Sequence, residues 1–215
     1  MKNVKKNKQD TKGRDVFEIN NFDSIKFNQY YYELEDFYKK PDEVYNLFNT
    51  ISPTLHKWEE KNSLNTVDFL DCRHVIFSEE FKDVEKKLYK LVNRDSSKIE
   101  GKLLTNFTKF FNIKNEFHEN YWWPHTDDNT YNCIIYLNHT PCDGTNLYEK
   151  IINKNTKSNE HQQPWQSKKN YKLLYNIKSK YNKLVIFKSN IFHGLAYNEN
   201  KFKNKFRKNQ VIFID

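Results

Sequence analysis

The sequence predicts an α+β protein whose second half is a β-sandwich or barrel, and two observations lead to this fold class. Before Gly101 the apolar residues recur mainly at the spacing of amphipathic helices, whereas after it short apolar strands follow one another at hairpin spacing. The chain has 215 residues, 16% of them aromatic, which is enough to bury one core without disulfides. We therefore expect one domain over 16–215, preceded by a flexible basic tail over 1–15.

The first half of the chain is predicted to contain two strands followed by helices. Val16–Ile19 and Tyr30–Phe37 are rich in β-branched and aromatic residues, which favour strands. A helix is expected over Pro41–Phe48, since proline and acidic residues suit a first helical turn. Further helices are expected over Ser52–Glu60 and Phe81–Val92, the second of which has an apolar stripe.

The second half is predicted to consist of strands joined by turns and loops. The strands are expected at Leu103–Phe111, Tyr131–Leu137, Asn146–Tyr148, Tyr171–Ile177, Leu184–Phe187 and Arg207–Ile214. Residues 149–170 are polar and irregular, so we expect a long loop or an insertion there.

The composition excludes several classes of protein. The sequence contains neither of the common glycine-rich nucleotide-binding motifs and no apolar run long enough to span a membrane. A net charge of +8 allows a nucleic-acid partner, but the lysines are scattered along the chain, so this partner is not favoured. The three cysteines, Cys72, Cys133 and Cys142, form no CxxC pair and follow no secretory signal. We therefore expect free thiols and a cytoplasmic protein.

Three residues that suit one metal ion flank the apolar strands of the second half. His125 and Asp127 precede the strand Tyr131–Leu137, and side chains two residues apart in an extended chain point to the same side. His193 follows the strand Leu184–Phe187, where we expect a loop at the mouth of a barrel. An HxD pair alone is more often part of a surface loop. Two histidines and one carboxylate together form the facial triad of non-haem Fe(II) oxygenases.

At this point the chain resembles the 2-oxoglutarate/Fe(II)-dependent dioxygenases, and within them the prolyl-hydroxylase-like branch. The resemblance covers Leu103 to Asp215 and is carried, in order, by HTDD, CIIYLN, DGTNLYE, LVIFKSNIFHG and FRKNQVIFID. It implies a double-stranded β-helix (a jelly-roll, cupin-like core) mainly over 103–215. It also implies N-terminal helices packed on one sheet and a metal ion at one open end.

The resemblance also implies roles for individual residues. His125, Asp127 and His193 match the iron ligands. Three further residues match or are expected at the co-substrate site, namely Arg207, Tyr136 and Asn132. Arg207 would grip the distal carboxylate of 2-oxoglutarate through two parallel hydrogen bonds, although Lys205 lies close enough in sequence to take this role instead. Tyr136 would bind the same carboxylate, and Asn132 would face the co-substrate.

The implied activity is that of an Fe(II)- and 2-oxoglutarate-dependent dioxygenase that consumes O2 and releases succinate and CO2, with ascorbate as an optional reductant. In the related halogenases a small residue replaces the carboxylate ligand, so Asp127 favours hydroxylation. The substrate would be a protein side chain or a small molecule. The alternatives are a nucleic-acid oxidative demethylase of the same chemistry and a non-catalytic β-helix module that binds a partner. Residues 149–170 would either cover the active-site mouth or form a solvated insertion.

Overall fold

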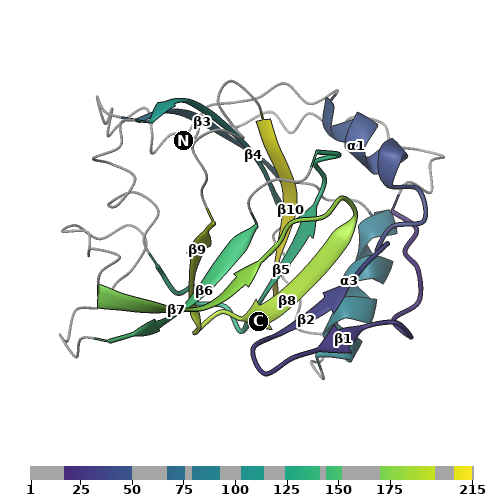
Figure 1. Ribbon diagram of the computed structural model, residues 1–215. Helices are drawn as coiled ribbons and strands as arrows, with labels where there is room; N and C mark the ends of the chain where they lie inside the picture. Colours follow the sequence, from purple (N-terminus) through teal and green to yellow (C-terminus); the bar gives the residue numbers. More distant parts are fainter. Residues whose placement is uncertain are drawn as a thin grey trace, which may run out of the picture.

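The computed structural model describes residues 17–49, 67–75, 79–92, 103–113, 124–140, 144–151, 170–196 and 206–214. Within these ranges the chain forms two antiparallel β-sheets and two helices (Figure 1). Figure 1 shows the smaller sheet on the left and the helices on the right, with β5, β8 and β10 between them. The protein is therefore mainly antiparallel β-structure in the parts of the chain that are described.

The larger sheet has seven strands in the order β1-β2-β8-β5-β10-β4-β3. Their bounds are Lys26–Phe27 (β1), Tyr31–Leu34 (β2), Val67–Val75 (β3), Leu103–Ile113 (β4), Tyr131–Tyr136 (β5), Lys183–Lys188 (β8) and Phe206–Ile214 (β10). The smaller sheet has three strands in the order β7-β6-β9. Their bounds are Thr145–Lys150 (β6), Tyr171–Ile177 (β7) and Phe192–Leu195 (β9).

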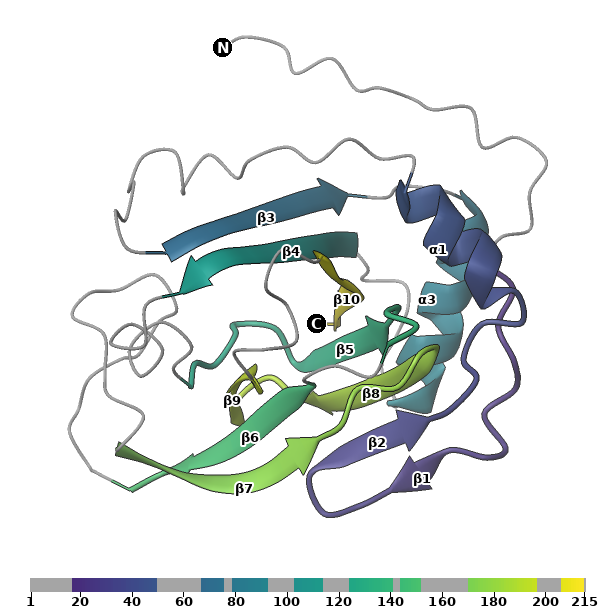
Figure 2. The ribbon, with the colours of Figure 1, turned by 45° about the horizontal axis from the view of Figure 1, so that its top comes forward.

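Helices α1 (Pro41–Asn49) and α3 (Glu79–Leu91) cover one face of the larger sheet (Figure 2). Val44 of α1 and Leu88 of α3 are fully buried and belong to the same apolar cluster as Cys133, Ile135 and Leu184. Pro41 begins α1, and Asp42 and Glu43 follow in its first turn, where a negative charge stabilises the end of a helix. The main core therefore lies between the helices and strands β5 and β8.

A second apolar cluster lies between the two sheets. Tyr136 of β5 and Val185 and Phe187 of β8 pack against Leu147 and Ile177 of the smaller sheet. Side chains alternate along a strand, so the residues of β5 that do not face the helices face the smaller sheet. Strand β8 is apolar on both faces because it contributes to both clusters.

Most of the predicted elements of the second half are confirmed, and β7 has the predicted bounds. In the first half, the strand predicted at Tyr30–Phe37 is confirmed as β2, whereas β1 and β3 were not predicted. Strand β3 has the sequence VDFLDCRHV, and its charged residues conceal the strand pattern. It pairs with β4 alone among the described strands, and polar residues are well tolerated at the edge of a sheet.

Other predictions are corrected or lie outside the described residues. The strand expected at Val16–Ile19 is reduced to one isolated bridge between Ile19 and Tyr38. The tail over 1–15, the helix over Ser52–Glu60 and residues 152–169 of the predicted loop lie outside the described ranges. The first residues of that loop are part of β6, which runs to Lys150.

The structure also bears on the cysteines and on membrane-spanning helices. Cys133 is a buried free cysteine, and burial raises the pKa of its thiol. The helices within the described ranges are all too short or too polar to cross a membrane.

Candidate metal centre

The backbone of the smaller sheet places His125 and His193 side by side. His193 lies in β9, opposite Leu147 of β6, and on its other side it forms an isolated antiparallel bridge with His125. The His125 N–H donates to the His193 carbonyl at 2.9 Å, and the His193 N–H donates to the His125 carbonyl at 2.8 Å. Directly opposed residues in such a pair project their side chains to the same side. The two imidazole centroids accordingly lie 4.4 Å apart.

The placement of His193 corrects one expectation from the sequence. The residue was expected in a loop after a buried strand, but it lies inside the short strand β9. Only residues 189–191 separate β9 from β8, and the Ile191 N–H closes the turn by donating to the Lys188 carbonyl at 3.0 Å. The chain thus leaves the larger sheet and enters the smaller one within a few residues, and His193 is anchored by backbone pairing.

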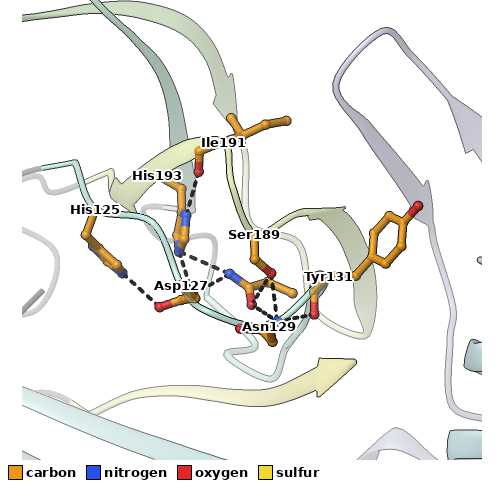
Figure 3. Close-up of polar contacts among 8 residues, drawn as sticks. His125, Asp127, Asn129, Tyr131, Ser189, Ile191 and His193 are labelled. Carbon is orange, nitrogen blue, oxygen red and sulfur yellow. Dashed lines mark hydrogen bonds and ion pairs between the residues drawn. The ribbon is translucent and has the colours of Figure 1, made fainter. Parts of the chain in front are cut away.

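Asp127 completes the cluster from the segment that leads into β5. Its backbone N–H donates to the Ser189 carbonyl at 3.1 Å, which fixes the carboxylate beside the turn between β8 and β9. Asp127 Oδ2 lies 3.1 Å from His193 Nε2, and Asp127 Oδ1 lies 3.9 Å from His125 Nε2. The three side chains converge in Figure 3. One ligating atom from each residue lies within 4.8 Å of the other two, so a single metal ion could contact all three.

A hydrogen bond fixes the orientation of the His193 ring. His193 Nδ1 lies 2.9 Å from the Ile191 carbonyl oxygen. Figure 3 draws this contact as a dashed line. A carbonyl can only accept, so Nδ1 carries a proton, and Nε2 is the nitrogen that faces Asp127 and can bind a metal ion once it has no proton of its own. Histidines that bind metals commonly have their other ring nitrogen held in this way. His193 is therefore prepared to bind a metal ion through Nε2, the atom that faces Asp127.

The electrostatics of the cluster keep Asp127 ionised. Burial alone would raise the pKa of the Asp127 carboxyl, but hydrogen bonds from His193 and Asn132 and the positive charge available on both histidines outweigh it. Together they lower the pKa to about 2. A metal ligand has to be deprotonated, so the carboxylate is in its ligating form at neutral pH.

Asn132 of β5 belongs to this cluster. Its Nδ2 donates to Asp127 Oδ2 at 2.6 Å, and its Oδ1 accepts from Asn129 Nδ2 at 2.8 Å and from Ser189 Oγ at 3.0 Å. The expected role of Asn132 at the co-substrate stays a prediction, and its described contacts are with two candidate metal ligands and with Asn129 and Ser189. Asn129 and Ser189 were not predicted. Short polar residues flanking a strand are the only signal that the sequence offers for them.

The other two predicted site residues lie on neighbouring strands. Tyr136 is buried between the sheets, and its hydroxyl shares a hydrogen bond of 2.8 Å with Thr145 Oγ1 of β6. The backbone of Arg207 lies in β10, two residues before Asn209, which pairs with Tyr136. The side chain of Arg207 and all of Lys205 lie outside the described part of the structure. The predicted roles of Arg207, Lys205 and Tyr136 towards 2-oxoglutarate therefore stay predictions.

Comparisons with known proteins find similarity in structure and none in sequence. No family model matches the sequence, and a search of curated proteins gave no match. Among solved structures, the chain is similar to an oxidoreductase of the 2OG-Fe(II) oxygenase family from Burkholderia pseudomallei. The two are 11% identical, the alignment covers 85% of this chain and 82% of that chain, and the TM-score is 0.41. We base the functional proposal on the residues of the metal centre, because a similarity of this size carries no argument about function.

Proposed function

We propose that the protein is an Fe(II)- and 2-oxoglutarate-dependent dioxygenase that hydroxylates its substrate. The observation that carries this proposal is the convergence of His125, Asp127 and His193. Their donor set of two imidazole nitrogens and one carboxylate oxygen matches the facial triad of non-haem Fe(II) oxygenases. Such a triad leaves positions on the ion open for a co-substrate and for O2.

In this proposal the three residues hold the ion. His193 binds through Nε2 because Nδ1 is engaged with the Ile191 carbonyl, and Asp127 supplies a negative charge that partly neutralises the ion. A bound Fe(II) would promote the reaction of O2 with 2-oxoglutarate, in which one oxygen atom enters succinate as CO2 is lost and the other becomes the hydroxyl oxygen of the product. The surrounding chain holds the ligands in place and limits the access of water.

The same proposal assigns the distal carboxylate of 2-oxoglutarate to Arg207, with Lys205 as the alternative. Alternation along β10 would put the side chain of Arg207 on the face of Asn209, whose strand partner is Tyr136. The planar guanidinium group suits a carboxylate because it donates two parallel hydrogen bonds. Tyr136 would add its hydroxyl group to the same site.

We further propose that the two packed sheets form a double-stranded β-helix. Its support is that β5 and β8 pack against β6 and β7, and that His125 and Asp127 are held by backbone hydrogen bonds beside the passage of the chain from β8 to β9, which carries His193. A prolyl-hydroxylase-like activity on a protein side chain, or hydroxylation of a small molecule, follows from the sequence resemblance. Supplying peptides, metabolites and oligonucleotides in turn and measuring which class accelerates succinate formation distinguishes the substrates.

The test needs no knowledge of the substrate. Protein purified without metal is loaded anaerobically with Fe(II), and 2-oxoglutarate is then added. We expect one ion per chain, a visible charge-transfer absorption when the 2-oxo acid binds, and succinate formation after O2 is admitted. Asp127→Ala serves as the control and should show none of these. Failure to bind Fe(II), or binding of Fe(II) with no response to 2-oxoglutarate, would refute the proposal.

A further inference from the structure

Asn132 touches two of the three candidate metal ligands with one amide nitrogen. Its Nδ2 lies 2.6 Å from Asp127 Oδ2 and 3.2 Å from His193 Nε2. The side chain is buried, and β5 holds its backbone between β8 and β10. The three-ligand arrangement is complete without Asn132, because the ion needs only the two histidines and the carboxylate.

The orientation of the Asn132 amide is determined by its neighbours. Oδ1 accepts hydrogen bonds from Asn129 Nδ2 and from Ser189 Oγ, while Nδ2 faces a carboxylate that can only accept. The reversed amide would direct its oxygen at the Asp127 carboxylate and its NH2 group at the Asn129 amide. Ser189 is itself fully buried. Its backbone N–H donates to the Thr130 carbonyl, and its carbonyl accepts from the Asp127 N–H. The amide is therefore locked in place.

A locked amide makes the two oxygens of Asp127 unequal. Oδ2 accepts a short charge-assisted hydrogen bond, which draws electron density from it, whereas Oδ1 lies on the side of His125 and has no described hydrogen bond. The hydrogen bond also fixes the rotation of the carboxylate about its Cβ–Cγ bond. Oδ1 is consequently the better metal donor of the two.

We propose that Asn132 is a positioning residue that makes Asp127 bind the ion through one oxygen, Oδ1. This inference rests on the metal centre of the proposed function. One-oxygen binding matters because a carboxylate that binds through both oxygens occupies an additional position on the ion. With one oxygen from Asp127, a six-coordinate ion keeps the three positions that a chelating co-substrate and O2 require.

The experiment compares Asn132→Leu with the wild type in metal binding alone. Leucine has a similar shape but cannot donate, so the carboxylate loses its restraint. We expect Co(II) and Mn(II) to bind about 10–100-fold more weakly, the usual loss when a residue that supports a ligand is removed. We also expect an altered Co(II) absorption spectrum, because the intensities of its bands depend on coordination number. Ser189→Ala removes one donor to Asn132 Oδ1 and should shift both measurements in the same direction, by less.

Asn182→Gly is the matched control. Asn182 is a buried asparagine whose amide bonds the backbone N–H and carbonyl of Tyr38, each at 2.8 Å, and none of its described contacts is with the metal centre. Its φ of 62° suits glycine, so the variant loses hydrogen bonds without adding backbone strain. We expect a lower melting temperature with unchanged metal affinity and spectrum, which separates a general loss of stability from an effect on the ligands.

The outcomes separate this inference from the proposed function. Wild-type affinity and an unchanged Co(II) spectrum in Asn132→Leu would overturn the role of Asn132 and leave the metal centre intact. Absence of metal binding by the wild type, or wild-type binding by Asp127→Ala, would instead refute the metal centre and the inference with it. If Asn132→Leu does not fold, Ser189→Ala decides by the same two measurements.

Discussion

His193 and His125 are direct partners in an antiparallel bridge, each backbone N–H donating to the carbonyl of the other. The separation of the two imidazoles is therefore set by backbone hydrogen bonds and does not depend on side-chain contacts. Asp127 is tied to the same place by its backbone hydrogen bond to Ser189. The candidate metal centre is therefore part of the sheet framework, and this has consequences for the variants described below.

Alanine in place of His125, Asp127 or His193 should abolish metal binding and leave the fold intact. The bridge and the Asp127–Ser189 hydrogen bond use backbone atoms, which alanine retains. The loss of affinity should exceed the roughly 10–100-fold expected of a supporting residue. Anaerobic titration with Fe(II) or Co(II) measures the affinity, and circular dichroism checks the fold. A folded variant with the iron content and succinate production of the wild type would remove that residue from the centre.

Tyr136→Phe tests whether the Tyr136 hydroxyl serves the co-substrate or only the fold. Both Tyr136→Phe and Thr145→Val remove the hydrogen bond between β5 and β6, so each should lower the free energy of unfolding by about 1 kcal/mol. Only Tyr136→Phe removes the hydroxyl from the proposed 2-oxoglutarate site. We expect a raised KM for 2-oxoglutarate in Tyr136→Phe and a smaller change in Thr145→Val. Equal KM values in the two variants would restrict Tyr136 to a structural role.

Arg207→Ala should raise the concentration of 2-oxoglutarate that turnover requires, with little change in iron affinity. A charged hydrogen-bond partner lost from a buried site costs about 2–5 kcal/mol, which corresponds to roughly thirty-fold to several-thousand-fold weaker binding. Lys208→Ala is the control, since Lys208 Nζ lies 4.0 Å from the centre of the Tyr45 ring on α1, on the helix side of the sheet. If Arg207→Ala needs no more 2-oxoglutarate than the wild type while Lys205→Ala needs much more, Lys205 is the residue that binds the distal carboxylate.

Gly144→Ala should destabilise the smaller sheet. A Cβ atom at Gly144 would lie 1.9 Å from the Ile177 carbonyl oxygen and 2.8 Å from the Ser179 nitrogen, both of which are backbone atoms. The Gly144 carbonyl also accepts from the Ala196 N–H at the end of β9. Forcing a methyl group into a packed site costs about 1–3 kcal/mol, and backbone atoms cannot move aside as a side chain can. Chemical denaturation measures the loss, and an unfolding free energy equal to that of the wild type would contradict this packing.

Periodicity in the sequence predicted the strands that are buried on at least one face. The bounds of β7 were predicted as observed, and β5, β8 and β10 were placed to within a residue or so at each end. These strands carry apolar residues because their side chains pack in one core or the other. Strand β3 was missed because an edge strand needs few apolar residues, and its charged residues resemble those of a loop.

The sequence by itself determined which residue types are available for a metal ion, namely an HxD pair before one buried strand and a histidine after another. Only the tertiary structure decided that they meet. The reason is that β9 and the segment at His125 belong to different parts of the chain, and their pairing depends on long-range backbone hydrogen bonds that no local pattern encodes. The same holds for Asn132. Its alternation within β5 was readable from the sequence. Its contact with Asp127, however, depends on the turn at Ser189, which leads from β8 to β9 beside the start of β5 and holds the backbone of Asp127.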